Sequence, residues 1–426
     1  MSLALENVRI LDFSRIWAGP HCTKLLADMG AEVIKVESTR IWDPHRTIVG
    51  SGNLPNGELG PDPWNRSGWF NTLHMSKYGI TLDLATRQGK LIAKELVNIS
   101  DVVIENFRAG SMDKIGLGYE TLRKIKPDLV MMSMPAFGNT GPWREFIQYG
   151  VGQEQLGGVA SVTGYHGDDA PIKSGVNFGD PIAGAHAAGA VMSALLYRRR
   201  SGQGLFIDLS QLESTISVIG EHILDYQMNK CNPEKLGNRH PIYAPHGVYR
   251  CRATRPNDDV NHVRDEDWVT IAVTSDMEWK DLCRVIGKPA LANDDRFIST
   301  LTRQDHIEEL DAILSQWVAD FDSYEVMTKL QVANIPCTPV LSGEGIFNDP
   351  QFQYRQLLEL VDHESTGPYL LPGFAWKMSK TPTTLRWPSP RLGQHNYEIF
   401  GELLGMAFDE IEDMESQGII GDTPLS

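Results

Sequence analysis

The first 200 residues alternate between short apolar runs and longer segments with the periodicity of amphipathic helices. The apolar runs are typical of buried strands and lie at residues 8–13, 32–36, 79–84, 101–105 and 129–134. The helical segments lie at residues 21–29, 86–98 and 119–125. Strands that alternate with helices predict an α/β fold, in which helices cover both faces of a parallel sheet. Ligands of such sheets bind beyond the carboxyl ends of the strands.

The clearest helical pattern covers residues 181–200. Asp180 stands at the expected N-cap and Pro181 at the first helical position, and the arginines at 198–200 complement the dipole at the other end. The body of this helix reads AGAHAAGA, and side chains this small allow another backbone to approach closely. We expect a strand at residues 205–209 and a long helix at residues 211–230 to follow.

The composition changes near residue 231, where the chain reads NPEKLGNRHPIYAPHG. Two strand-like pieces, GVYRCR and DWVTIAV, and several helical patterns come after this segment. We therefore predict a smaller α+β domain over residues 231–325. The large domain is expected to be discontinuous, built from residues 1–230 and 326–426, with a final helix near residues 394–404.

Charge and cysteine content argue against several classes of function. Lys and Arg total 39 against 55 Asp and Glu, and the net charge of −16 argues against a nucleic-acid or anionic-membrane partner. No apolar run predicts a transmembrane span, and the N-terminus lacks the features of a signal peptide. The five cysteines are dispersed without a CxxC motif, which favours reduced thiols in the cytoplasm, and the histidine spacing predicts no metal site.

Asp180 is the main candidate for covalent chemistry. A carboxylate at a helix N-terminus feels the positive end of the dipole, so we expect it to be ionised and oriented. Carboxylates form covalent acyl intermediates when they are held near an activated carbonyl. Gly179 would leave the approach to the carboxylate open. The alternative is that Asp180 only caps its helix.

Two other segments could bind an anionic ligand. Asn106 and Phe107 directly follow a predicted strand, and Arg108 and Lys114 beyond them could hold a phosphate or could belong to a solvated basic loop. Trp17 and Ala18 likewise follow a strand and precede a helix, whose N-terminus favours anions.

The loop from about residue 38 to residue 70 mixes aromatic and cationic side chains. These are Trp42, His45, Arg46, Trp64, Arg66, Trp69 and Phe70. Together with Trp17, the rings could wall a pocket for an organic acid, and an arginine such as Arg46 could pair with a second carboxylate. They could equally only pack the loop. We predict that Trp17, Trp42, His45 and Arg46 contact the acid substrate.

Three segments together resemble the class III CoA-transferases, the family of formyl-CoA transferase and carnitine CoA-transferase. They are LDFSRIWAGPHCTKLLADMGAEVIKVES, DVVIENF and GDPIAGAHAAGAVMSALLYRRRSGQGLFIDLS. The resemblance implies a Rossmann-like large domain made from both chain ends and two chains that interlock as a dimer. It also implies that Asp180 is the covalent nucleophile.

Contacts with coenzyme A are implied by the same resemblance. They fall on Trp17, Ala18, Leu73, Met75, Ser76, Asn106, Phe107, Arg108, Lys114, Gln148 and Tyr149. The arginine that often follows the VIKxE glutamate is replaced by Ser38, so we expect Arg40 to substitute for it. The glycine-rich lid of the formyl-CoA enzymes is missing from residues 250–266, which argues against formyl or oxalyl substrates.

The implied reaction moves coenzyme A from an acyl-CoA, for which succinyl-CoA is the expected donor, to a carboxylic acid such as a substituted succinate. It needs no metal, because the thioester energy is conserved. Two alternatives stay open. The same family contains α-methylacyl-CoA racemases, although Tyr149 occupies the position of their histidine and has an ordinary pKa of about 10. The chain could also be the structural CoA-binding subunit of a heteromer, although the intact Asp180 favours an active chain, acting as a homodimer or with a related subunit.

Overall fold

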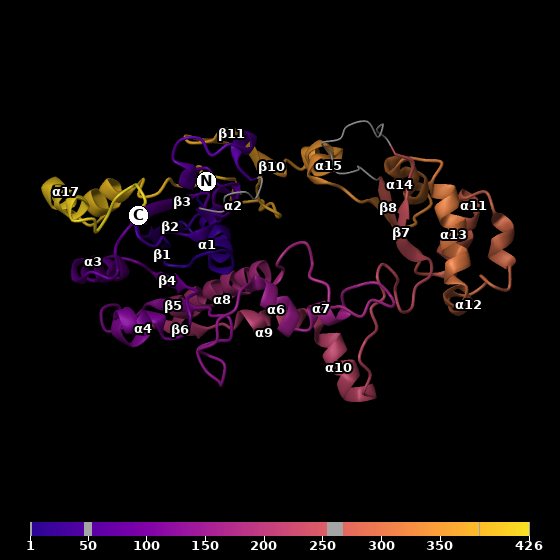
Figure 1. Ribbon diagram of the computed structural model, residues 1–426, viewed down its shortest axis with the longest axis horizontal. Helices are drawn as coiled ribbons and strands as arrows, with labels where there is room; N and C mark the ends of the chain where they lie inside the picture. Colours follow the sequence, from indigo (N-terminus) through magenta and orange to yellow (C-terminus); the bar gives the residue numbers. More distant parts are fainter. Residues whose placement is uncertain (1, 47–52, 254–266, 383, 426) are drawn as a thin grey trace. The chain divides into compact units, whose positions relative to one another are not determined.

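The computed structural model describes residues 2–46, 53–253, 267–382 and 384–425. The chain forms two compact units (Figure 1). Unit 1 contains residues 1–160, 173–232 and 351–426, and unit 2 contains residues 161–172 and 233–350. The larger unit is therefore built from both ends of the chain.

Unit 1 is organised around a parallel sheet of six strands in the order β3-β2-β1-β4-β5-β6. The strands are β1 (Arg9–Asp12), β2 (Glu32–Glu37), β3 (Lys77–Thr81), β4 (Val102–Glu105), β5 (Val130–Ser133) and β6 (Leu205–Asp208). This is the strand order of a Rossmann fold, and it reverses between β1 and β4. The mixed α/β architecture with a parallel sheet is thus confirmed.

Helices cover both faces of this sheet. The helices of unit 1 are α1 (Ala18–Asp28), α2 (Gly68–Leu73), α3 (Arg87–Asn98), α4 (Ser111–Ile115), α5 (Tyr119–Leu122), α6 (Gly150–Leu156), α8 (Gly179–Ser201), α9 (Gln211–Ile216), α10 (Gly220–Asn229) and α17 (Phe408–Ser416). Alternate strand residues pack on opposite sides: Leu11 faces the core under α3 and α17, whereas Ile10 faces the core under α1 and α8. The small residues of α8 serve this packing, because a Cβ added at Gly184 would lie 2.6 Å from the carbonyl oxygen of Ala18.

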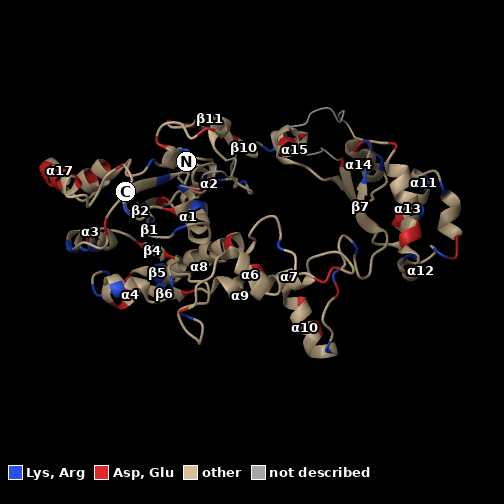
Figure 2. Cartoon of the chain, viewed as in Figure 1, with Lys and Arg blue, Asp and Glu red and all other residues tan. Residues whose placement is uncertain are grey.

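The C-terminal segment returns to the sheet. After the hairpin β10 (Leu358–His363) and β11 (Gly367–Pro372), a π-helix spans Glu398–Leu403. The Asn396 side chain accepts a bond from the Thr81 N–H over 2.9 Å, which ties this return to β3. Figure 2 shows how strongly α17 is marked by acidic residues, and its sequence FDEIEDMES contains no Lys or Arg.

Unit 2 is an α+β unit with its own core. Its antiparallel strands are β7 (His246–Arg250), β8 (Trp268–Ala272) and β9 (Cys337–Pro339), and its helices are α11 (Asp276–Val285), α12 (Thr300–Asp305), α13 (Ile307–Val318), α14 (Ser323–Val332) and α15 (Gly343–Asn348). Two short helices, α7 (Val159–Val162) and α16 (Pro350–Tyr354), lie where the chain passes between units. Residues 326–350, expected in the large domain, belong to unit 2, because β9 pairs with β8 and α14 packs on it.

Two helices differ from the expectation. Residues 211–230 do not form one helix: α9 ends at Ile216, a 3₁₀ turn covers Ser217–Ile219, and α10 starts at Gly220. Helix α8 begins before the expected cap, so that Phe178 is the N-cap and Asp180 lies inside the first turn. None of the helices in the described ranges has the length and apolar character that crossing a membrane requires.

Candidate active site

The reversal of strand order places the ends of β1 and β4 side by side, and the loop after β1 is held there by Asn106. The Asn106 side chain donates from Nδ2 to the Arg15 carbonyl over 2.8 Å, and its Oδ1 accepts from the Arg15 N–H over 2.7 Å. This pair of bonds replaces the ladder that a neighbouring strand would supply. The side chain predicted to contact coenzyme A therefore fixes the loop that precedes α1.

Ile16, the next residue, has a strained backbone. Its φ is 69°, a left-handed conformation that is a genuine outlier for a β-branched residue. The Asp43 carboxylate accepts from the Ile16 N–H at 3.1 and 3.3 Å and from the His45 N–H at 2.9 Å. Such strain persists only where the surroundings over-determine the conformation, which is common at functional sites.

Buried charges lie behind this loop. Asp12 is fully buried and accepts bonds from Ser14, from Thr23 Oγ1 at 2.6 Å and from Lys77 Nζ at 3.4 Å. Burial alone would raise the pKa of Asp12, but Lys77, Lys35 and the two hydroxyls outweigh it and hold the pKa below its usual value. Burial lowers the pKa of Lys77 to about 8, although Asp12 opposes the shift.

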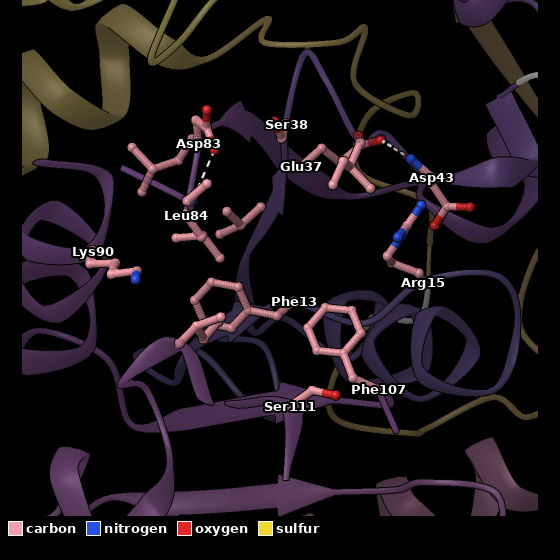
Figure 3. Close-up of a pocket in the computed structure, with 15 residues that line it drawn as sticks. Phe13, Arg15, Glu37, Ser38, Asp43, Asp83, Leu84, Lys90, Phe107 and Ser111 are labelled. Carbon is pink, nitrogen blue, oxygen red and sulfur yellow. Dashed lines mark hydrogen bonds between the residues drawn. The ribbon is translucent and has the colours of Figure 1, made fainter. Parts of the chain in front are cut away.

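A cavity of about 340 Å³ opens at the same edge of the sheet. Its apolar walls include Phe13, Phe107, Leu82 and Ile115. Figure 3 shows Lys90 and Arg15 on opposite sides of the cavity, with the rings of Phe13 and Phe107 between them. The cavity thus combines aromatic surface, which suits a ring, with two cations and with the carboxylates of Glu37, Asp43 and Asp83.

Aromatic side chains meet where α1 begins. Trp17 and Trp69 make an edge-to-face contact with ring centroids 5.1 Å apart, and the His45 ring lies 5.4 Å from Trp69. His45 is buried, and burial lowers its pKa, so the imidazole is neutral near pH 7. The predicted contact Trp42 is half-buried, and its carbonyl accepts a bond from Arg15 Nη2 at 2.5 Å.

Arg46 is unavailable to a substrate. Its guanidinium is fully buried and forms a bidentate pair with Glu37 at 2.8–3.1 Å, and it also lies 3.5 Å from the centre of the Phe70 ring. The prediction that Arg46 pairs with a substrate carboxylate is therefore wrong for this conformation, because Glu37 at the end of β2 already neutralises it.

Asp180 stands in the first turn of α8 and is 7% exposed. Within the described ranges no cation pairs with its carboxylate. Burial and the nearby Glu154 raise the pKa of Asp180 to about 7. We expected an ionised group, but burial and the negative neighbour both favour the protonated form of this carboxyl.

The profile of "CoA-transferase family III" matches residues 5–396. The chain belongs to this family. It is 33% identical to the succinyl-CoA–D-citramalate CoA-transferase of Chloroflexus aurantiacus over 98% of both chains. It is 30% identical to a formyl-CoA:oxalate CoA-transferase of Streptomyces avermitilis, over 99% of this chain and 100% of the relative. A solved CAIB/BAIF family protein from Brucella suis matches 95% of this chain and 100% of its own, with 31% identity and a TM-score of 0.81.

Several predicted coenzyme A contacts of this CoA-transferase are buried in unit 1. Met75 and Ser76 are fully buried and Leu73 nearly so. The returning C-terminal segment bonds to Ser76: the Ser76 N–H donates to the Trp387 carbonyl over 3.0 Å, and Ser76 Oγ accepts from the Arg386 N–H over 3.1 Å. The structure thus separates these three positions from the cavity, whereas Phe107 lines it.

The predicted cations lie mostly on the surface. Arg40 pairs with Asp83 at 3.5 Å and does not line the cavity. Arg108 is exposed and lies 3.6 Å from Glu145, and Lys114 is exposed on α4. Farther along the chain, Tyr149 is exposed, and Gln148 has a buried Nε2 without a hydrogen-bond partner.

Sequence reasoning missed four residues of the site. Arg15 and Lys90 line the cavity. Gly150 leaves the space that the Asp180 carboxyl occupies, and Glu154 raises the pKa of that carboxyl. Arg15 could have been found from its place in the strand end LDFSRIW, but nothing local marks the other three. Residues 254–266, which include most of the segment where the glycine-rich lid is missing, lie outside the described residues. Elsewhere, no group of three His, Cys, Asp or Glu side chains could hold a metal ion.

Proposed function

We propose that this CoA-transferase moves coenzyme A from succinyl-CoA to a substituted dicarboxylic acid, with Asp180 as the covalent nucleophile. The single observation that supports this most is the state of Asp180, a buried carboxyl at the start of a long helix with no cationic partner among the described residues. A carboxylate without a partner retains its lone pairs for attack.

Each step of the proposed reaction forms a new thioester or anhydride as it breaks the previous one, so no other source of energy is needed. An Asp180 oxygen attacks the thioester carbonyl and the C–S bond breaks. Coenzyme A leaves as a thiolate, and Asp180 and the succinyl group remain joined as a mixed anhydride. The thiolate attacks the aspartyl carbonyl, releasing succinate and forming an aspartyl-CoA thioester. The acceptor carboxylate then attacks this thioester and expels the thiolate. The thiolate attacks the acceptor carbonyl of the new anhydride, which yields acceptor-CoA and frees Asp180.

For coenzyme A we propose a place at the edge where β1 and β4 end. The cavity between Phe13 and Phe107 suits the adenine ring, and Arg15 and Lys90 on its sides suit anionic groups of the nucleotide. These two cations would serve in place of the missing arginine at Ser38, since Arg40 is paired with Asp83. Arg108 and Lys114, exposed after β4, would hold phosphate at the cavity rim.

For the acceptor we propose the aromatic surface of Trp17, Trp69 and His45. It offers apolar contact to a substituent on the acid. The Chloroflexus relative is named for D-citramalate, which is a methyl- and hydroxyl-substituted succinate. Formate or oxalate would leave most of this surface without contact.

We also propose that the chain acts as an interlocked homodimer. Apolar side chains on α8 and α10 lie exposed in one protomer, among them Leu196, Tyr197, Leu224, Tyr226 and Met228. Exposed apolar area of this kind marks interaction surfaces. Sedimentation at low micromolar concentration tests this, and a compact monomer would contradict it. A heteromer would instead show as a second, related subunit that restores activity.

The proposed reaction is tested with the purified protein and succinyl-CoA. The acceptor panel is D-citramalate and aryl- or alkyl-succinates against formate, oxalate and carnitine, and acyl-CoA products are followed by mass spectrometry. In parallel, hydroxylamine should capture the acylated enzyme at Asp180 alone. Preferred use of the small acids or of carnitine would overturn the acceptor assignment, and capture at a different residue would overturn the nucleophile.

A further inference from the structure

Glu154 on α6 is buried beside the catalytic carboxyl and has no role in the reaction described above. It is 1% exposed, and its carboxylate accepts a bond from the Phe178 N–H at 2.6 Å. Ser174 Oγ lies 2.8 and 2.9 Å from the two carboxylate oxygens, and its single proton is shared between them and the Val176 carbonyl oxygen. A longer bond from the Ser174 N–H measures 3.3 Å. All these contacts are bonds that the carboxylate accepts, as an ionised carboxylate requires.

These bonds fasten the segment that leads into α8. Ser174 and Phe178 bracket the residues just before Asp180, and Phe178 is the N-cap of the helix. The side chain of the N-cap residue itself makes no capping bond to α8. The bond from the Phe178 N–H to Glu154 is therefore a tertiary anchor at the place where a local cap is missing.

Helix α6 also limits where the Asp180 carboxyl can stand. A Cβ added at Gly150 would lie 2.0 Å from Asp180 Oδ2, and a Cβ added at Gly179 would lie 2.2 Å from Gln153 Oε1. Gln153 is itself fixed, because its Nε2 donates to Gln211 Oε1 over 2.6 Å, and Gln211 donates to the Met134 carbonyl. The carboxyl thus lies against a rigid surface made by α6 and α9.

We propose, on the basis of the proposed function, that Glu154 is a positioning residue for Asp180: it anchors the start of α8 and holds a second carboxylate beside the nucleophile. The anchored backbone fixes the direction of attack. The second negative charge disfavours ionisation of Asp180.

Glu154 is the charged neighbour that raises the pKa of Asp180, although other titratable groups lie on the elements around α8. The elements packed on α8 contribute His21, Cys22, Lys24 and Asp28 from α1, Glu213 from α9 and Asp208 from β6, and α8 itself carries His186. Burial is the largest cause of the raised pKa of Asp180, and Glu154 is the charged group that adds to it. A change at Glu154 should therefore be visible in the titration of Asp180.

The test compares Glu154→Gln with Glu213→Gln, which removes an exposed carboxylate from a neighbouring helix. In Glu154→Gln an amide N–H₂ group faces the donors of Ser174 and Phe178, and the charge is lost. We expect kcat to fall by about tenfold to a hundredfold, since small misplacements at a reacting centre have effects of this size. The KM for succinyl-CoA should change little, because Glu154 does not line the cavity.

The pH dependence distinguishes positioning by Glu154 from a general structural effect. Removing a like charge lowers the pKa of Asp180, so the acid limb of kcat/KM should move to lower pH in Glu154→Gln and stay in place in Glu154→Asp. Carbodiimide labelling of Asp180, read by peptide mass spectrometry between pH 5 and pH 8, follows the same titration without turnover. It therefore tests Glu154 even if no acid in the panel is a substrate, the result that would count against the proposed function.

A Glu154→Gln protein with the kcat, the acid limb and the labelling midpoint of Glu213→Gln would overturn the proposal. If Glu154→Gln does not fold, Ser174→Ala removes one anchoring bond and keeps the charge. It should lower kcat and leave the labelling midpoint unchanged, and a Ser174→Ala enzyme with full kcat would contradict the anchoring role.

Discussion

Asp12 and Asp180 are both buried aspartates of unit 1, yet their surroundings shift their pKa values in opposite directions. Asp12 at the end of β1 receives bonds from two hydroxyls and from Lys77, and its pKa lies below the usual value. Asp180 at the start of α8 has Glu154 as its charged neighbour, and its pKa rises to about 7.

The difference separates a structural carboxylate from the one that we propose as the nucleophile. Both carboxyl groups lose contact with water on folding. Only Asp12 gains hydrogen bonds and ion pairs in its place, and these stabilise the charged form. A carboxylate with all its lone pairs engaged cannot attack a thioester. Asp180 has no such partner among the described residues, so its lone pairs stay available for the attack that we propose.

The largest effect is expected when the reactive member is removed. Asp180→Ala should lower CoA transfer by about 10³-fold or more, because loss of a covalent nucleophile leaves only binding and electrostatic terms. Turnover is measured with succinyl-CoA and the best acceptor, and circular dichroism checks that the fold is intact. Near-normal turnover would show that Asp180 is only part of a helix end.

Removing the buried partner of Asp12 should instead lower the stability of the fold. Lys77→Met leaves Asp12 buried next to Lys35 alone and should lower the free energy of unfolding by about 3–5 kcal/mol. Urea unfolding measures the loss. Lys124→Met, which removes an exposed lysine, is the matched control and should stay within about 0.5 kcal/mol of the wild type. Equal midpoints for the two variants would contradict the importance of the buried pair.

Displacing the Asp180 carboxyl without removing it should lower the activity less than Asp180→Ala does. Gly150→Ala places a methyl group 2.0 Å from Asp180 Oδ2, so the carboxyl must move. Activity should fall by about a hundredfold while the stability changes little. Gly220→Ala is the control, since Gly220 also begins a short helix and a Cβ there meets nothing within 4 Å. Equal activity in the Gly150→Ala and Gly220→Ala enzymes would place the Asp180 carboxyl elsewhere.

Arg108 and Lys114 are exposed cations that test substrate binding, independently of the two aspartates. Arg108→Ala and Lys114→Ala should each raise the KM for succinyl-CoA by about tenfold or more, because a phosphate contact contributes about 1.5–3 kcal/mol. Higher salt should weaken binding further in the wild type. Unchanged KM values in both variants would place the nucleotide at a different part of the sheet edge.

The last expected effect concerns stability against pH. The folded-state pKa of Asp180 is raised to about 7, so the folded protein holds this proton more tightly than the unfolded chain. The wild type therefore loses stability as the pH rises from about 4 to about 7. Asp180→Asn lacks this loss, so its melting temperature relative to the wild type should be higher at pH 8 than at pH 4. The same difference at both pH values would mean that Asp180 titrates normally.

The order of the elements in unit 1 was determined by the local sequence. Helix α3 was expected at residues 86–98 and covers Arg87–Asn98, with the Thr86 hydroxyl accepting from the Gly89 N–H as its cap. The apolar runs became the strands of the parallel sheet. Periodicity and caps act over a few residues, so a single sequence contains the information for them. Asp180 at the start of α8 also came from such a local pattern.

Tertiary structure decided what each side chain can do. Arg46 was expected to be free, but it is paired with Glu37 and donates to the Pro390 carbonyl, 344 positions away. Ser76 is covered by Trp387 and Arg386, and the pKa of Asp180 depends on Glu154 from another helix. Burial and charge pairing are set by residues distant in the chain. A local pattern can therefore place a carboxylate at a helix end, whereas its reactivity depends on which partners the fold brings to it or keeps away.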